Sequence, residues 1–178
     1  MIWACHSAVA LREAAQMGVY GCYKGAKELL GLGAISKLPR LLCVQQSDCA
    51  PMVHAYKEGS PSIRPHHIIS KPAGIAEAIL RGDPSRAYPH VRRIVVESGG
   101  DFVAVSEDEI RRARVLVEEM EGVSPCFSAS ASVAGVIRQV SDGLLPKTDT
   151  VLINLTGSDR RREVSGEVSW WRWCWPGR

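Results

Sequence analysis

A hydrophobic run that ends in a hydroxyl group and a glycine is the feature of this sequence most suggestive of chemistry. Residues 150–155 predict a short strand, and Thr156 and Gly157 follow it directly. Polar groups at the carboxyl edge of a parallel sheet lie where open α/β folds bind ligands. Upstream, residues 121–135 lead from a short apolar segment into a helix start rich in serine and alanine. Together these segments indicate a ligand site without identifying the ligand.

The cysteines and histidines do not indicate a metal site. The six cysteines are Cys5, Cys22, Cys43, Cys49, Cys126 and Cys174. They never form a C-x-x-C pair, so we expect reduced, mostly buried thiols and no zinc site. His66 and His67 are adjacent in a predicted loop, and neighbouring side chains of an extended chain point in different directions. We therefore expect neither a chelating histidine pair nor any metal centre.

Composition describes an ordinary globular domain. The chain has 178 residues, 46% hydrophobic and 23% charged, which is enough for one domain with a core. A net charge of +3 is too small to indicate a nucleic-acid partner. No apolar run approaches the ~18 residues of a membrane helix. No basic region precedes the short apolar patch at the N-terminus, so we expect a cytoplasmic protein.

Helical and strand-like segments alternate along the chain, with short connections. The predicted strands are residues 40–45, 101–105 and 150–155. The predicted helices are residues 8–17, 20–32, 47–59, 72–80, 85–97, 106–120 and 128–140. Ser106 and Glu109 predict a capping box, and Ser47 with Asp48 predicts the start of an earlier helix. This order favours an α/β fold, a three-layer αβα sandwich with a mostly parallel sheet.

The last segment, residues 158–178, differs in character from the rest. Four of the five tryptophans fall in its final nine residues, without a periodicity that would bury them on one face. An altered reading frame or a degenerate end is the favoured interpretation. An aromatic–arginine patch for nucleic acid or a membrane interface is the alternative.

The central part of the chain resembles threonine synthase. The matching motifs are residues 21–28, 38–40, 44–51, 97–100, 105–110 and 155–157. Residues 75–89 look most like cysteate synthase, an archaeal offshoot of the same family. The resemblance covers residues 21–157, which we expect to form the large-domain portion, preceded by a divergent segment 1–20. It implies a pyridoxal-phosphate enzyme of the tryptophan-synthase-β-like fold, acting on a small-molecule amino acid as a homo-oligomer without nucleic acid or membrane.

The resemblance also implies a reaction. Members remove phosphate from a phosphorylated amino acid and add a nucleophile at the resulting unsaturated carbon. In cysteate synthase, O-phosphoserine and sulfite give L-cysteate and phosphate, a step of coenzyme M biosynthesis. The alternative within the family is threonine synthase, which acts on O-phosphohomoserine with water as nucleophile.

Site residues follow from the positions that match the family motifs. Thr156, with Gly157 after it, matches the hydroxyl that hydrogen-bonds the pyridine nitrogen of the cofactor. Gln45 matches a strand-end position beside the cofactor ring. The candidates for the substrate pocket are Gln46, Ser47, Asp48 and Cys126. Cys126 stands where threonine synthase commonly has a glutamate, which counts against plain threonine synthase.

Two parts of the family pattern have no match in this sequence. The Schiff-base lysine is not present, because Lys24 and Lys27 match other helix positions and are expected to be solvated. No glycine cluster in residues 1–19 could cradle the cofactor phosphate. We therefore expect a fragment that is inactive alone and prone to aggregate, and a non-catalytic remnant or interaction module is the third alternative.

Overall fold

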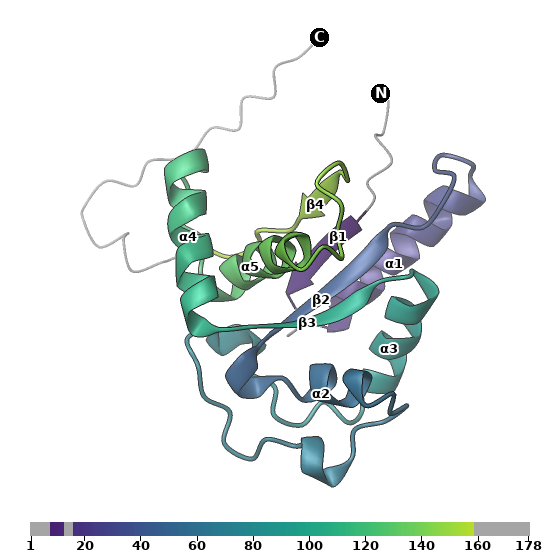
Figure 1. Cartoon of the computed structure of the whole chain (residues 1–178). Helices are drawn as coiled ribbons and strands as arrows, with labels where there is room; N and C mark the ends of the chain where they lie inside the picture. The colour runs from purple at the N-terminus through teal and green to yellow at the C-terminus, as the bar shows by residue number, and fades with distance from the viewer. Residues whose placement is uncertain (1–7, 13–15, 159–178) are drawn as a thin grey trace.

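A four-stranded parallel sheet forms the centre of the molecule (Figure 1). The computed structural model describes residues 8–12 and 16–158, and the side chains from residue 18 onward. The strands are β1 (Ala8–Arg12), β2 (Arg40–Gln46), β3 (Asp101–Val105) and β4 (Val151–Ile153). Their order is β3-β2-β1-β4, and every pair is parallel. The carboxyl ends of all four strands therefore lie at one edge of the sheet.

Alternate residues of β2 face the two sides of the sheet and build two cores. Leu41 and Cys43 pack with Phe102 against α1 (Gln16–Gly31), α2 (Pro51–Lys57) and α3 (Tyr88–Glu97). Leu42 and Val44 pack on the opposite side, against α4 (Glu107–Glu121) and α5 (Phe127–Ser141). Because β2 is buried on both faces, it reads as a continuous apolar run. The predicted three-layer αβα fold is confirmed.

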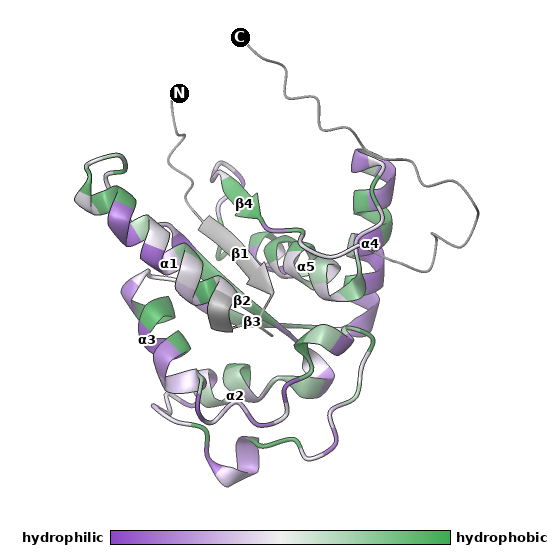
Figure 2. Ribbon diagram, turned by 180° about the vertical axis from the view of Figure 1, so that it is seen from behind, coloured by the Kyte–Doolittle hydropathy of each residue, from purple (hydrophilic) through white to green (hydrophobic). Residues whose placement is uncertain are grey.

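Helix α4 shows how a local sequence signal sets an element. Ser106 accepts a hydrogen bond from the Glu109 N–H at 3.3 Å, and the Glu109 carboxylate accepts one from the Ser106 N–H at 2.7 Å. This is the predicted capping box. Gly122, with φ 67°, ends the helix in the left-handed region that glycine adopts readily. Figure 2 shows hydrophilic and hydrophobic residues in turn along α4, whose buried residues are Ile110, Ala113 and Val117.

Three sequence predictions of local structure are wrong. Residues 8–17 do not form one helix: Ala8–Arg12 is the strand β1, paired on both sides, and α1 begins at Gln16. Residues 72–80 are helical only in the 3₁₀ turn Glu77–Ile79. Ser47 does not cap α2, because Ser47–Cys49 is a separate 3₁₀ turn and α2 begins at Pro51. For residues 8–12, pairing with two neighbouring strands overrides the weak local preference for a helix.

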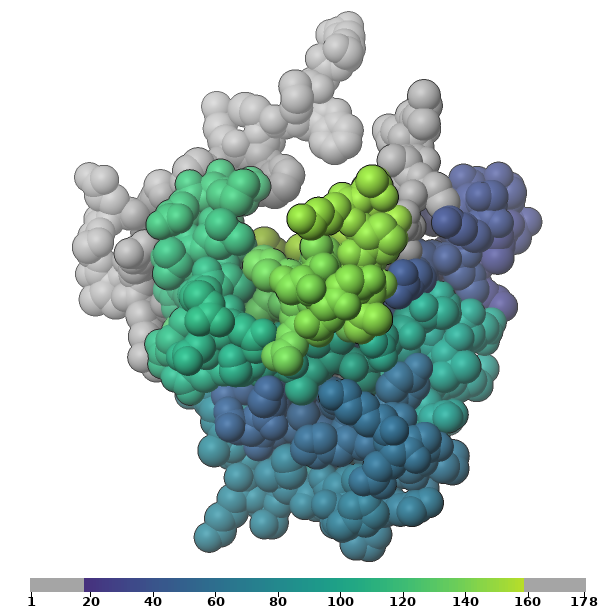
Figure 3. All heavy atoms as spheres, viewed as in Figure 1, coloured from purple at the N-terminus to yellow at the C-terminus, as the bar shows by residue number. Residues whose placement is uncertain are grey.

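The connection between α2 and α3 forms the lower end of the molecule in Figure 3, and α4 and the α5–β4 region lie above it. It contains the predicted loop 60–71, interrupted by the 3₁₀ turn Pro65–His67. Among the described residues, none of the helices has the length and apolar character needed to cross a membrane. Apart from Ser158, the tryptophan-rich segment lies outside the described residues.

Candidate functional site

The carboxyl edge of the sheet brings Cys126 next to Gly157. The Cys126 N–H donates a 2.9 Å hydrogen bond to the Gly157 carbonyl, and Pro125 forms an antiparallel bridge with Ser158. Cys126 is the N-cap residue of α5, so the start of this helix lies against the segment that follows β4. Thr156 is exposed in that segment. Three of the predicted site residues therefore come together here.

Gln45 has a structural task that the sequence did not reveal. Its buried side-chain oxygen accepts hydrogen bonds from the N–H groups of Met52 (3.0 Å) and Val53 (3.2 Å). These are orphan donors of the first turn of α2, so Gln45 supplies the cap expected from Ser47. Within the described chain its buried Nε2 has no hydrogen-bond partner. That amide is the part of Gln45 still able to donate to a ligand.

Gln46 points to the other side of the sheet and holds a loop. Its oxygen accepts from the Ala76 N–H at 3.0 Å, and its Nε2 donates to the Asp48 carboxylate at 3.0 Å. A Cβ at Gly74 would overlap the amide of Gln46, and Gly74 has φ 148°, so this close approach requires glycine. Ser47 and Asp48 are exposed on their 3₁₀ turn. Gln46 thus positions residues 74–76 beside the start of α5.

An open depression lies between that loop, α4 and α5. Its lining residues are Gly74, Ile75, Glu77, Ala78, Arg111, Arg114, Cys126, Phe127, Ser128 and Ser158. Of the predicted site residues, Cys126 lines it and Gln46 borders it through the loop. Sequence reasoning missed Arg111, Arg114 and Ser128. No local motif marks the arginines, since they belong to the surface of α4 and reach the depression only through the packing of α4 on α5.

The lysines and buried cysteines are not arranged as nucleophiles. All six lysines (Lys24, Lys27, Lys37, Lys57, Lys71 and Lys147) lie in the described chain, and all are exposed on helices or connections. Lys24 pairs with Glu28, and Lys27 pairs with Glu97 at 3.0 Å, which confirms that both are surface side chains. Burial raises the pKa of the Cys49 thiol, near the end of β2, and favours its protonated form.

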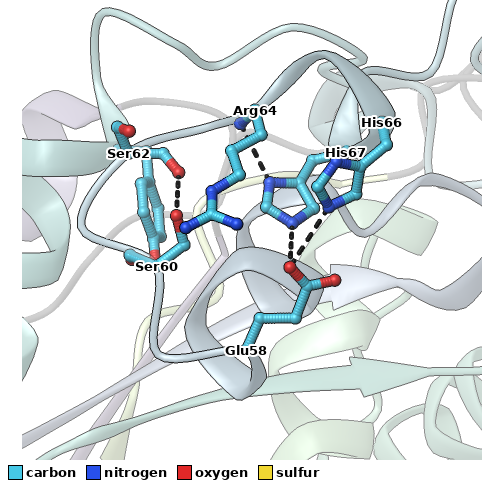
Figure 4. Close-up of polar contacts among 7 residues, drawn as sticks. Glu58, Ser60, Ser62, Arg64, His66 and His67 are labelled. Carbon is cyan, nitrogen blue, oxygen red and sulfur yellow. Dashed lines mark hydrogen bonds and ion pairs between the residues drawn. The ribbon is translucent and has the colours of Figure 1, made fainter.

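Glu58, His66 and His67 form a polar cluster at the end of α2 (Figure 4). The Nε2 atoms of His66 and His67 lie 3.1 Å and 2.9 Å from the same Glu58 oxygen. The expectation that the two rings point apart is wrong, because both sit on a tight 3₁₀ turn rather than an extended chain. The hydrogen bonds from His67 and then His66 lower the pKa of the Glu58 carboxyl.

The hydrogen bonding of His67 does not suit a metal ligand. The Arg64 N–H donates to Nδ1 of His67 at 3.0 Å, so the proton of the neutral ring is on Nε2 and faces Glu58. A histidine that binds a metal through Nε2 normally donates a proton from its other nitrogen. Here that nitrogen accepts one, so the cluster is a hydrogen-bonded clamp.

Comparisons with known proteins agree with this fold and show the family. The family model described as "Pyridoxal-phosphate dependent enzyme" matches residues 17–157. Threonine synthase from Methanosarcina acetivorans is 34% identical over 135 residues, 76% of this chain and 32% of the relative. Threonine synthase from Mycobacterium bovis is 35% identical over 136 residues, 76% of this chain and 34% of the relative. Cysteate synthase from Methanocella paludicola is 33% identical over 138 residues, which cover 72% of this chain and 32% of the relative.

Solved structures share the fold at lower identity. The L-serine ammonia-lyase from Rhizomucor miehei has a TM-score of 0.66 and 17% identity, covering 88% of this chain and 46% of that one. Threonine deaminase isoform 2 from Solanum lycopersicum has a TM-score of 0.62 and 15% identity, and the match covers 89% of this chain and 42% of that one. The chain spans about one third of the length of the curated relatives it matches.

Proposed function

Since the chain belongs to the family of pyridoxal-phosphate-dependent enzymes, we propose that it forms part of an enzyme that replaces the phosphate of a phosphorylated amino acid by a nucleophile. The observation that carries this proposal is the meeting of Cys126 with the segment 156–157 at the carboxyl edge of the sheet. Ligands of open α/β folds bind at this edge. The resemblance to threonine synthase and cysteate synthase supplies the reaction class.

Pyridoxal phosphate is the cofactor of this family, and the residues at the sheet edge fit it in their donor chemistry. When bound, it supplies an electron sink. The exposed Thr156 hydroxyl can donate a hydrogen bond to a ring nitrogen, and the unpartnered Nε2 of Gln45 can donate to another acceptor. A neutral hydroxyl, unlike a carboxylate, leaves a pyridine nitrogen largely unprotonated. That preference restrains the electron sink and suits elimination followed by addition.

For the substrate, we propose a cysteate synthase-like exchange of the phosphate of O-phosphoserine for sulfite, within coenzyme M biosynthesis. The support is the resemblance of residues 75–89 and the cysteine at position 126. Gln46, Ser47 and Asp48 are the candidates for the substrate pocket, with Cys126. Threonine synthase is the second candidate, and the identities of 34% and 35% to two threonine synthases favour it. Binding titrations of the chain with O-phosphoserine and with O-phosphohomoserine would separate the two, since they do not require turnover.

The described chain holds no lysine at the sheet edge, so we propose that it binds the cofactor without covalent attachment and does not turn over substrate alone. Borohydride treatment of the mixture with pyridoxal phosphate, followed by peptide mass spectrometry, tests this directly. A single modified lysine would contradict the proposal. An unmodified chain that still binds the cofactor would support it and would also separate it from a remnant that binds no cofactor.

Changing Thr156 to valine should weaken the binding of pyridoxal phosphate, measured by fluorescence titration, by about tenfold, the value of one hydrogen bond. Because Thr156 is exposed, the melting temperature should stay unchanged. Thr150→Val, at an exposed position before β4, is the matched control and should bind like the wild type. Equal affinity in all three proteins would remove Thr156 from the site.

A further inference from the structure

An exposed apolar stripe runs along α4 and into the groove that α4 forms with α5. Leu116 and Met120 are four residues apart and share one face of α4, and Val123 follows one residue after the C-cap of this helix. Leu116 lines the groove together with Ile137 of α5. All four side chains are exposed, Met120 at 72% and Ile137 at 42%. Exposed apolar side chains that lie next to one another indicate a surface that another segment covers.

The end of α4 that carries this stripe is acidic. Glu119 and Glu121 are exposed beside Met120, and neither has an ion pair within the described chain. The carboxylates of the groove itself are neutralised, since Arg138 pairs with Glu109 at 3.0 Å and with Asp142 at 3.7 Å. The segment that covers the stripe should therefore be apolar with positive charge at one end.

The tryptophan-rich segment, residues 158–178, starts beside this end of α4. Ser158 forms an antiparallel bridge with Pro125, which lies four residues after Glu121, the last residue of α4. The eleven residues 159–169 can span up to about 36 Å, whereas a helix of 15 residues such as α4 is about 22 Å long. Trp170, the first tryptophan of the segment, is therefore within reach of the whole stripe.

The composition of the segment matches the surface in charge and in apolar character. Residues 159–178 contain five arginines and three acidic residues, and the run 160–162 is all arginine. This run follows the bridge at Ser158 almost directly, where Glu119 and Glu121 are exposed. The four tryptophans come later and suit the apolar stripe, and an indole ring can also stack on the guanidinium of Arg112, which lines the groove.

We infer that residues 159–178 dock on α4 and α5 of their own chain, with the arginine run at Glu119 and Glu121 and the tryptophans over the apolar stripe. The bridge at Ser158 makes this contact intramolecular, so a short connection keeps the segment at a high effective concentration beside α4. The inference does not depend on the proposed function, because neither the cofactor nor the substrate takes part in the contact.

The direct test is methyl NMR of the full chain in a Trp3→Phe background, in which all indole signals come from the segment. Nuclear Overhauser contacts should join indole protons to the methyl groups of Leu116, Met120 and Ile137. A sample that mixes labelled and unlabelled chains shows whether these contacts form within one molecule. Contacts that form only between two molecules, or no contacts with these methyl groups, would overturn the inference.

Variants of the stripe test the same contact by fluorescence. Met120→Lys and Ile137→Lys should each raise the ratio of undocked to docked segment at least about tenfold, because they place a charge against the indole rings. The readout is quenching of the indole emission by acrylamide, which should approach that of the urea-unfolded chain. Val96→Lys is the matched control: Val96 is 52% exposed but lies on α3, on the opposite side of the sheet.

The charged part of the contact has its own variant. R160Q/R161Q/R162Q should increase the quenching in the same direction, and added salt should do so in the wild type, because screening weakens exposed ion pairs. Far-UV circular dichroism equal to that of the wild type would show that each variant keeps its fold.

Three fluorescence results would contradict docking on this surface. One is a wild type whose tryptophans are quenched as strongly as in urea. Another is equal protection in Met120→Lys, Ile137→Lys and Val96→Lys, which would place the tryptophans elsewhere. The last is protection that disappears on dilution, which would mean that the segment binds a second copy of the chain.

Discussion

Single residues at the edge of the sheet combine structural and functional tasks. Gln45 and Gln46 are adjacent, but they point to opposite faces of the sheet and hold different segments. Gln45 caps α2, and Gln46 fixes the loop at Ala76. A sequence motif cannot show that one glutamine caps a helix and the other holds a loop, because these roles depend on which segments pack on each face of the sheet. Substitutions at either glutamine will therefore mix stability with any effect on binding.

Glu58 should make stability depend on pH. Its folded pKa lies below the ordinary value of 4.5, because His67 and His66 bind the carboxylate. The unfolded chain binds the proton more readily, so the contribution is fully present above pH 4.5 and is lost as the pH falls through the folded pKa. Denaturant unfolding between neutral and acid pH should show a shallower acid decline for Glu58→Gln than for the wild type.

The control for that series removes the same charge elsewhere. Glu119→Gln, on the exposed side of α4, changes the net charge equally without touching the histidine cluster. Its acid decline should follow that of the wild type. Parallel curves for the wild type and Glu58→Gln would mean that the clamp contributes nothing to pH-dependent stability.

At the scale of elements, the close approach of α5 to β2 fixes the position of the N-terminus of α5, where Cys126 lies. A Cβ at Gly135 would lie 2.5 Å from Cγ2 and 3.1 Å from Cγ1 of Val44, so glycine is needed for this contact. Buried small side chains run along α5 from Ser128 to Ala134 and allow the helix to lie close to the sheet. The sequence prediction of a small-residue packing helix therefore agrees with the buried face of α5. Its N-terminus reaches the depression because of this packing.

Gly135→Ala should lower the free energy of unfolding by about 1–3 kcal/mol, the usual cost of overpacking a core contact. Gly25→Ala is the matched control, because a Cβ at that position in α1 meets no atom within 4 Å. It should raise stability by about 0.5–1 kcal/mol through helix propensity alone. Urea titrations of both variants measure the difference, and a neutral Gly135→Ala would show that α5 can move away from β2 without penalty.

At the scale of the whole molecule, β4 leaves one edge of the sheet open in the described structure. Leu152 and Leu155, at 50% and 39% exposure, present apolar side chains there. Unpaired strand edges and exposed apolar groups favour association with other chains. We therefore propose that the chain self-associates through this edge, in keeping with the homo-oligomer and the tendency to aggregate expected from the sequence.

Leu152→Lys should shift the chain toward monomer in sedimentation velocity, because a charge on an edge strand opposes pairing. Leu32→Lys is the control: Leu32 is the more exposed side chain, at 81%, but it follows α1 and lies away from the sheet edge. Its association should match the wild type. A monomeric wild type, or equal shifts in both variants, would count against the β4 edge.

The sequence by itself determined the layers, the strands β2 and β3, the capping box of α4 and the family. These rest on local signals: continuous apolar runs, helical periodicity and short motifs with a direct physical meaning. It could not determine β1, since the four apolar residues Ala8 to Leu11 fit either a strand or a helix, and pairing with β2 and β4 decides. Only the tertiary structure shows that the Gln45 side chain caps α2 and that His66 and His67 both contact the Glu58 carboxylate. It also brought Arg111, Ser128 and Gly74 to one depression, because contacts between distant segments follow from packing across the sheet and leave no local pattern.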